Sequence, residues 1–180
     1  MDPPEGYRAE IIEGAIELSP TARRSHGLIA NRVRRALDRF LDGGDYACYQ
    51  DMNVIHNRRA WIPDAFVAPE DTELCHDEDD MGVRADSVQL IVEVVSPGKR
   101  NQDRDRVKKR REYARAGILV YVVIDDYDGE GAVTLFTEPR PEAADWGDIR
   151  RFAYGREVVI PEGPAKGFAI DEAITGAGRG

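Results

Sequence analysis

The sequence contains only two cysteines, Cys48 and Cys75, and they do not form a CxxC pattern. This scarcity excludes a disulfide framework and a cysteine-based zinc site. Histidine is also scarce, because His26, His56 and His76 are the three in the chain and lack the HExxH or HxxxH spacing of a helical zinc site. The sequence therefore contains no recognisable zinc motif.

Long apolar runs and an apolar leader are also missing. No apolar run approaches the roughly 18 residues that a membrane-spanning helix needs. The start, MDPPEGYRAE, is acidic and has no apolar segment of the kind found in secretory signals. We therefore expect a cytoplasmic protein that does not interact with membranes.

The length of 180 residues predicts one domain, with its core at residues 7–170 and a tail at residues 171–180. The charge of this domain is unevenly distributed. With 25 basic and 34 acidic residues the net charge is −9, which opposes long-range attraction to a phosphate backbone. Residues 71–80 nevertheless carry six acids and no Lys or Arg, whereas residues 99–111 carry eight bases and two acids. This asymmetry is compatible with a local basic surface on an acidic protein.

The N-terminal part of the sequence predicts a hairpin followed by a helix. Two short strands are expected within residues 7–19, with a turn at Glu13-Gly14. Ser19-Pro20 is a helix-start signal, and apolar residues at three- and four-residue steps predict an amphipathic helix over residues 21–41. The other elements expected in this part are extended chain at residues 46–56, a short strand at residues 64–68 and a solvated acidic loop at residues 71–80.

The C-terminal part contains a predicted strand–helix–strand unit. Residues 88–95, VQLIVEVV, and residues 118–125, ILVYVVID, have the nearly continuous apolar pattern of buried strands. A charged helix over residues 103–116 joins them, so the two strands should be parallel. We expect an α/β fold, with a mixed β-sheet and a helix on each side. The other features expected here are strands near residues 132–137 and 149–160 and a frayed end at residues 176–180.

Two carboxylates stand out for their positions relative to the predicted strands. Glu93 lies inside a central strand between valines, where a carboxylate is costly unless it is paired or binds a metal. It is interpreted either as an edge-exposed or salt-bridged glutamate or as a metal ligand. Asp64 follows Pro63 at the start of another short strand, a position that is ordinary by itself. Together the two acids would suit Mg²⁺, which prefers oxygen ligands and keeps several waters.

The predicted helix 103–116 offers a cation for the same site. Asp105, Lys109 and Tyr113 are four residues apart and therefore share one helical face. Asp105 and Lys109 could instead form an exposed ion pair, and the many charges of this helix favour that alternative. Hydrolysis of a phosphate ester needs a cation near the attacking water, and Lys109 would supply it only if this helix flanks the carboxylates.

The order and spacing of these residues resemble those of the Uma2 family, part of the PD-(D/E)xK restriction-endonuclease-like superfamily. Pro63-Asp64 matches the family's PD, and Glu93 within EVVSP matches its acidic strand end. Asp105, Lys109 and Tyr113 match its D-x-x-x-K-x-x-x-Y helix.

The resemblance extends to the N-terminus and spans roughly residues 7–170. The opening AEIIEG is similar to the family's first hairpin, with Glu10 as its first acid, and His26 lies where the family often has a helix histidine. The resemblance implies a restriction-endonuclease-like α/β fold, a mixed β-sheet flanked by helices, with an N-terminal β-hairpin.

The implied activity is metal-dependent endonuclease hydrolysis of phosphodiester bonds in nucleic acid, with DNA as the expected substrate. Mg²⁺ or Mn²⁺ would be held by Asp64 and Glu93, and the backbone carbonyl of Val94 or Val95 could also ligate the metal. Lys109 would orient or deprotonate the attacking water and stabilise the developing charge.

One departure from the superfamily pattern concerns its lysine, which usually lies two positions after the acid. Val95 occupies that position here, so the resemblance implies that Lys109 has taken over the role, with Asp105 and Tyr113 positioning it. Lys108 must be told apart from Lys109. The two side chains differ in direction by about 100° on an ideal helix, so only one of them can face the sheet.

Other residues have weaker claims to a role. Glu10 is either an additional ligand or general base at the edge of the site, or an exposed strand residue. His26 is either a packed, hydrogen-bonded core residue or a catalytic residue. Asp51 and His56 are expected at the surface. The basic segment 99–111 is expected to be a solvated helix face, which would contact phosphates only if the helix flanks the site.

Two alternatives to an active nuclease stay open. The first is a catalytically weak or inactive module of the same fold that binds nucleic acid or a protein partner, which the net charge and the missing strand lysine favour. The second is a structural or oligomerising protein, which predicts that Glu93 is well exposed. RNA stays open as a substrate, and a homodimer is compatible with the fold.

Overall fold

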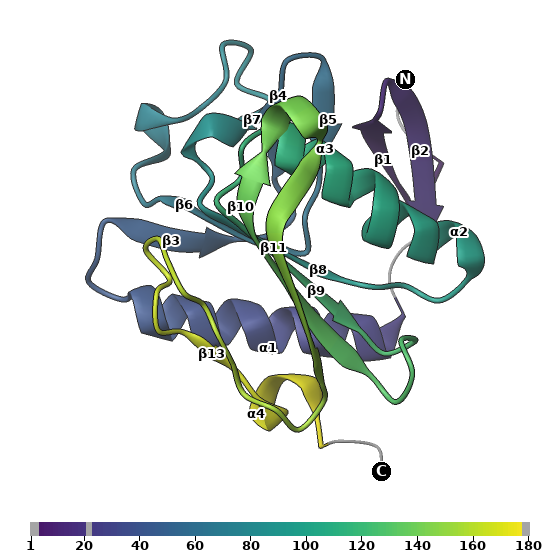
Figure 1. The fold of residues 1–180 in the computed structure, drawn as a ribbon. Coiled ribbons are helices and arrows are strands. Elements are labelled where there is room, and N and C mark those ends of the chain that lie inside the picture. Colours follow the sequence, from purple (N-terminus) through teal and green to yellow (C-terminus); the bar gives the residue numbers. More distant parts are fainter. Residues whose placement is uncertain (1–3, 21–22, 178–180) are drawn as a thin grey trace.

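The computed structural model describes residues 4–20 and 23–177 (Figure 1). A six-stranded mixed sheet lies at the centre, in the order β11-β10-β9-β8-β6-β3. The strand–helix–strand prediction is confirmed, because β8 and β9 pair in parallel, whereas the other adjacent strands of this sheet pair antiparallel. The strands are β3 (Tyr46–Tyr49), β6 (Ala65–Pro69), β8 (Leu90–Val94), β9 (Val120–Asp125), β10 (Ala132–Arg140) and β11 (Asp145–Ala153).

Helices cover both faces of the central sheet, as predicted. Helix α1 (Arg24–Leu41) lies along one face, and a continuous helical stretch lies on the other (Figure 1). Side chains of β8 alternate between the two cores: Val92 packs with the α1 side, and Ile91 packs with Tyr113 on the opposite side. Because Glu93 follows Val92, it points to the face covered by the second helical stretch.

That second stretch differs from the predicted helix in its length and its regularity. It begins at Lys99, four residues earlier than expected, and includes a π-helical turn. The sequence contains no helix-breaking residue between Lys99 and Asp103, so the helix starts directly after Gly98, whose φ is 96°. Its three parts are α2 (Lys99–Asp103), the π segment η3 (Arg104–Lys109) and α3 (Arg110–Arg115).

The N-terminal hairpin is confirmed, and it belongs to a second sheet that the sequence did not predict. The turn residues Glu13 and Gly14 have φ angles of 51° and 80°, as a tight turn requires. The sheet has the order β2-β1-β5-β4-β7. Two of its strands have only three residues each, too few to show a periodic pattern. The strands are β1 (Tyr7–Ile12), β2 (Ala15–Pro20), β4 (Asn53–His56), β5 (Arg59–Trp61) and β7 (Gly82–Arg84).

The expected start of the first helix is wrong. Ser19 and Pro20 belong to β2, because they pair with Arg8 and Tyr7 of β1, and α1 begins only at Arg24. Residues 21–22, which the prediction included in the helix, lie outside the described residues.

The C-terminal part also differs from the expectation. The single strand expected over residues 149–160 is two strands, because the chain turns at Gly155, whose φ is 84°. Of the expected frayed end, residues 178–180 lie outside the described residues. The remaining elements are β12 (Val158–Val159), β13 (Ala169–Ile170), α4 (Glu172–Thr175) and the short 3-10 turns η1 (Thr72–Leu74), η2 (Ala85–Ser87) and η4 (Pro141–Ala143).

None of the helices in the described part of the chain is long and apolar enough to cross a membrane.

Candidate active site

A cavity of about 180 Å³ lies where the β1–β2 hairpin, the start of α1, the end of β8 and the α2–η3 helix meet. It brings together most of the side chains that the sequence singled out. Its acidic lining residues are Glu10, Asp64 and Glu93, its basic lining residues are Arg8, Arg23, Arg104 and Lys109, and His26 also contributes to its wall.

Lys109 connects two of the acids. Its Nζ atom is 2.9 Å from Oε1 of Glu93 and 2.9 Å from Oε1 of Glu10. All three side chains are buried, with exposed fractions of 2% for Lys109, 3% for Glu93 and 5% for Glu10. The burial of Glu93 excludes the interpretation of an exposed glutamate, and that of Glu10 excludes an exposed strand residue.

Burial raises the pKa of Glu93 to about 8, and the neighbouring acids Asp64, Asp105 and Glu10 act in the same direction against Lys109. For Lys109, burial lowers the pKa, but the charges of Glu10 and Glu93 outweigh this effect, and its pKa lies above the ordinary value. The ammonium group of Lys109 is therefore charged at neutral pH.

Asp64 is held from two sides, directly before β6. Its Oδ2 atom accepts a hydrogen bond of 2.8 Å from the backbone N–H of Val94 and lies 3.1 Å from Nε2 of His26. Burial raises the pKa of Asp64, but the hydrogen bond and charge of His26, the charge of Lys109 and the N–H of Val94 outweigh it and lower the pKa. Because Val94 follows Glu93 on the neighbouring strand, this hydrogen bond fixes Asp64 beside the position of Glu93.

His26 is a packed and hydrogen-bonded residue that also lines the cavity. Burial lowers its pKa, but the contact with Asp64 outweighs this effect and the pKa is raised. The Nδ1 atom of His26 is buried and has no hydrogen-bond partner among the described residues. His26 therefore orients Asp64 through Nε2.

The carboxylates of the cavity each keep one oxygen that could contact a hard cation with part of its water shell. Each acid uses one oxygen for contacts with the protein: Oε1 of Glu10, Oδ2 of Asp64 and Oε1 of Glu93. Among the described residues no hydrogen bond is found to the second oxygen of any of them. The structure shows no group of three His, Cys, Asp or Glu side chains, within residues 4–20 and 23–177, that is arranged to hold a metal alone. Mg²⁺ suits such a site, because it binds through one or two carboxylates, waters and substrate oxygens.

The predicted helical triple lies at the site, but its contacts differ from the predicted ones. Tyr113 donates a hydrogen bond to Oε1 of Glu93, and no bond to Lys109 is found within the described residues. Asp105 forms an ion pair with Arg104 at 2.7 Å. Tyr113 therefore fixes Glu93, and Asp105 fixes Arg104, whereas both had been expected to position Lys109.

A π-helical turn alters the relative directions of Asp105 and Lys109. It spans Arg104–Lys109 and therefore includes both of these residues. A π turn contains more residues than an α turn, so side chains four positions apart no longer have the relative directions of a regular α-helix. The direction of Lys108 away from the cavity is nevertheless as expected, since its Nζ atom pairs with Oε1 of Glu17 at 2.6 Å.

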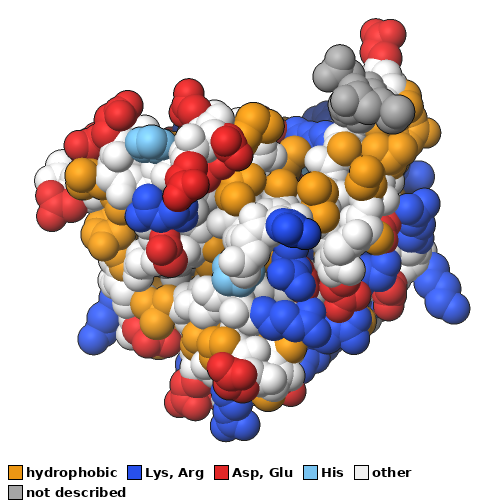
Figure 2. Space-filling model, turned by 90° about the horizontal axis from the view of Figure 1, so that it is seen from above, with side chains coloured by type: hydrophobic (Ala, Val, Ile, Leu, Met, Phe, Trp, Pro, Cys, Tyr) orange, Lys and Arg blue, Asp and Glu red, His pale blue; other side chains and the backbone are white. Residues whose placement is uncertain are grey.

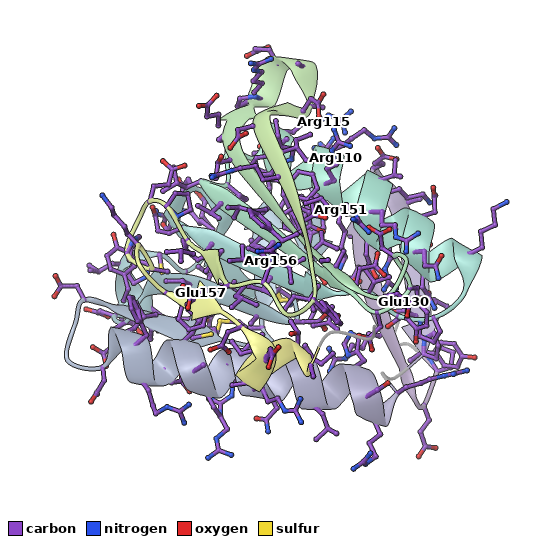
Figure 3. The ribbon with its side chains drawn as sticks, turned by 60° about the horizontal axis from the view of Figure 1, so that its bottom comes forward. Arg110, Arg115, Glu130, Arg151, Arg156 and Glu157 are labelled. Carbon is purple, nitrogen blue, oxygen red and sulfur yellow. The ribbon has the colours of Figure 1, made fainter. Side chains whose placement is uncertain are left out.

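Most charges of the basic segment 99–111 are neutralised by ion pairs, so it is not the freely solvated face that was expected. Figure 2 shows acidic side chains concentrated at one edge of the face seen from above, and Lys and Arg side chains over another part of it. Figure 3 shows Arg110 and Arg115 near the β10–β11 hairpin, whereas Arg156 and Glu157 lie on the segment between β11 and β12. The partners within or next to this segment are Arg100–Glu17, Lys108–Glu17, Arg106–Asp125, Arg110–Asp145 and Arg111–Glu13.

The other sequence candidates lie outside the cavity lining. Asp51 is exposed and pairs with Arg8 at 2.6 Å, as a surface residue does. His56 is partly buried and stacks on Trp61, with ring centroids 6.0 Å apart, so it is less exposed than expected. Val94 and Val95 are buried at the end of β8 and just after it, and a metal contact by either carbonyl stays a prediction.

Sequence reasoning did not identify the arginines of the cavity. Arg8 lies two residues before Glu10 on β1, and residues two apart on a strand share a face, so the pattern could have revealed it. Arg104 precedes Asp105 in a segment with eight bases, and nothing in the sequence distinguishes it from its basic neighbours.

Comparisons with known proteins identify the family of the chain and support its fold. The Uma2 family model, described as "Putative restriction endonuclease", matches residues 1–172 of the chain. The structure is similar to the crystal structure of "a putative nuclease belonging to DUF820" from Anabaena variabilis ATCC 29413, with a TM-score of 0.71 and 14% sequence identity. The alignment covers 93% of this chain and 89% of that one, which shows a shared fold. A search of curated proteins gives no match.

Proposed function

The chain belongs to the Uma2 family, and from this premise we propose that it is a metal-dependent endonuclease that hydrolyses phosphodiester bonds, with DNA as its substrate. The single observation that carries the proposal is the cavity in which Lys109 lies 2.9 Å from both Glu10 and Glu93, with Asp64 lining the same cavity. A lysine among three carboxylates is an arrangement suited to a cation, a water and a phosphate.

The proposed metal ligands are Asp64 and Glu93, and Mg²⁺ or Mn²⁺ is the proposed ion. When bound, such an ion lowers the pKa of a coordinated water and stabilises the negative charge that develops on a phosphate. Asp64 is suited to ligation because His26 and the N–H of Val94 both contact Oδ2, which fixes its carboxylate and leaves Oδ1 available. Glu93 is fixed in the same way, since Lys109 and Tyr113 both contact Oε1.

Lys109 is proposed as the residue that acts on the attacking water. Its ammonium group has three donor hydrogens, and contacts with Glu10 and Glu93 account for two of them. The third is available to orient a water or to donate to a phosphate oxygen. Glu10 accepts from Lys109 and from the backbone N–H of Ile62 through the same oxygen, so its proposed role is to hold Lys109 in place.

A binding module of the same fold is the second candidate. The buried ion pairs of Lys109 favour it, because they already neutralise Glu10 and Glu93. These ion pairs would have to rearrange before either acid could bind a metal ion. The net charge of −9 also weakens attraction to nucleic acid. In this second candidate the protein binds nucleic acid or a protein partner without hydrolysing it.

The experiment that tests the proposal is a cleavage assay with single-stranded DNA, double-stranded DNA and RNA, each with Mg²⁺, with Mn²⁺ or with EDTA. We expect cleavage of DNA with either metal and none with EDTA, because in this proposal the metal ion supplies the activated water. A binding titration on the same substrates accompanies it. Binding without cleavage under every metal condition would support the binding module, and cleavage of RNA alone would correct the proposed substrate.

A further inference from the structure

Arg104 is a cavity residue whose position is fixed by an acidic neighbour. Its Nε and Nη2 atoms donate to the two carboxylate oxygens of Asp105, at 2.7 Å and 3.2 Å. Asp105 is 1% exposed and Arg104 is 11% exposed, so both side chains are largely removed from water. Two parallel hydrogen bonds give this guanidinium a defined direction, whereas the guanidinium of a free surface arginine has none.

The remaining donor nitrogen of Arg104 is available to a ligand. Within the described residues, Nη1 has no hydrogen-bond partner, and Arg104 lines the cavity together with Lys109. Burial lowers the pKa of Arg104, but the charge of Asp105 outweighs this effect and the pKa lies above its ordinary value, so the guanidinium stays charged. A fixed and charged donor beside the proposed hydrolytic residues suits a phosphate oxygen, since guanidinium groups match phosphate geometry.

Arg106, two residues later on the same helix, forms an ion pair with Asp125 that lies outside the cavity. Its Nε atom donates to Oδ2 of Asp125 on β9 at 2.6 Å, and neither residue lines the cavity. Both pairs therefore consist of an arginine and a buried aspartate, and they differ in their access to the cavity. The π-helical turn contains both arginines, and it directs only Arg104 to the site.

We propose that Arg104 binds a non-bridging phosphate oxygen of the nucleic-acid strand in this cavity, and that Asp105 positions the guanidinium for that contact. The inference rests on the proposed function and adds to it a named phosphate-binding residue. Arg104 supplies substrate affinity, in contrast to Lys109, which acts on the attacking water. Such a contact has no base preference and is sensitive to salt.

The test compares two matched double variants, Arg104→Gln with Asp105→Asn and Arg106→Gln with Asp125→Asn. Each removes both charges of one arginine–aspartate ion pair, so neither leaves an unpaired buried charge. The affinity for a short labelled single-stranded DNA is measured by fluorescence anisotropy at several salt concentrations, with Ca²⁺, a cation with the same preference for oxygen ligands. We expect affinity to fall about tenfold or more for the first variant, which is the scale of one hydrogen bond to a charged group. The slope of log affinity against log salt concentration should also become smaller by about one. The second variant should bind like the wild type.

The single change Arg104→Lys provides a second test that keeps the charge and removes the two-bond fork. It should also weaken binding, because an ammonium cannot hold Asp105 and a phosphate in the same geometry. Equal affinity of the wild type, the Arg104 variants and the Arg106 variant would overturn the inference while leaving the proposed function intact. An equal loss in both double variants would overturn it too, since it would show general charge attraction. Absence of nucleic-acid binding by the wild type would instead reject the proposed function, and the inference with it.

Discussion

Replacing Lys109 by alanine is expected to slow DNA hydrolysis by about a hundredfold or more, the scale for losing a positioned acid–base or electrostatic group. The physical reason is that Lys109 acts on the attacking water and the developing charge, so its effect is larger in the transition state than in the bound substrate. The affinity for DNA should change much less than the rate. The measurement is the single-turnover cleavage rate beside a binding titration, for the wild type and Lys109→Ala.

Lys108→Ala is the matched control for this change. Lys108 is the adjacent lysine, but it pairs with Glu17 outside the cavity, so its loss should leave the cleavage rate nearly unchanged. Lys109→Ala also leaves Glu10 and Glu93 buried without their cation, which costs about 3–5 kcal/mol of stability for a buried pair. Folding must therefore be verified at the assay temperature by near-UV circular dichroism. Equal cleavage rates for folded Lys109→Ala and the wild type would show that Lys109 has no part in the chemistry.

Adding Mg²⁺ or Mn²⁺ to the wild-type protein is expected to raise its thermal midpoint, because a ligand that binds only the folded state stabilises that state. At a concentration of about 100 times the dissociation constant, the gain is about 2.7 kcal/mol. For a domain of this size that gain corresponds to about 5–10 °C. The double change Asp64→Asn with Glu93→Gln should abolish the rise, since it removes both proposed carboxylate ligands and keeps the shapes of their side chains.

The acidic loop at residues 71–80 is the competing explanation for any metal effect. The double change Asp79→Asn with Asp80→Asn provides the control, because both residues are exposed and lie outside the cavity. It should leave the rise in thermal midpoint intact. A rise that survives the change at Asp64 and Glu93 but disappears with the change at Asp79 and Asp80 would place the metal at the loop.

The part of the site that the sequence predicts consists of residues whose positions follow from strand pattern. Glu93 is an acid in an otherwise apolar strand, and such a residue is buried wherever the strand lies at the centre of a sheet. Helical geometry implies that only one of Lys108 and Lys109 faces the sheet, and the resemblance to the Uma2 family selects Lys109. The central parallel pair and the two covering helices follow from the same patterns.

The parts that the sequence does not predict depend on contacts between distant segments. The π-helical turn has no periodic signature in the sequence, and neither the pairing of Asp105 with Arg104 nor the contact of Tyr113 with Glu93 follows from residue spacing alone. The second sheet includes strands of three residues, which are too short to show alternation. The burial of Glu10 results from the packing of the β1–β2 hairpin against the helix, so its own neighbours in sequence do not reveal it.

The most direct test of the account is a cleavage time course with Mg²⁺ for the wild type and for Asp64→Asn with Glu93→Gln, purified in parallel and assayed on the same DNA. The account predicts that the wild type cuts the DNA. The double variant, verified as folded by near-UV circular dichroism, lacks both proposed metal ligands and should produce no fragments above background. Fragments formed at the same rate by both proteins would contradict it, because the activity would then come from elsewhere. Intact DNA with both proteins, together with binding by the wild type, would equally contradict the account and identify the protein as a binding module.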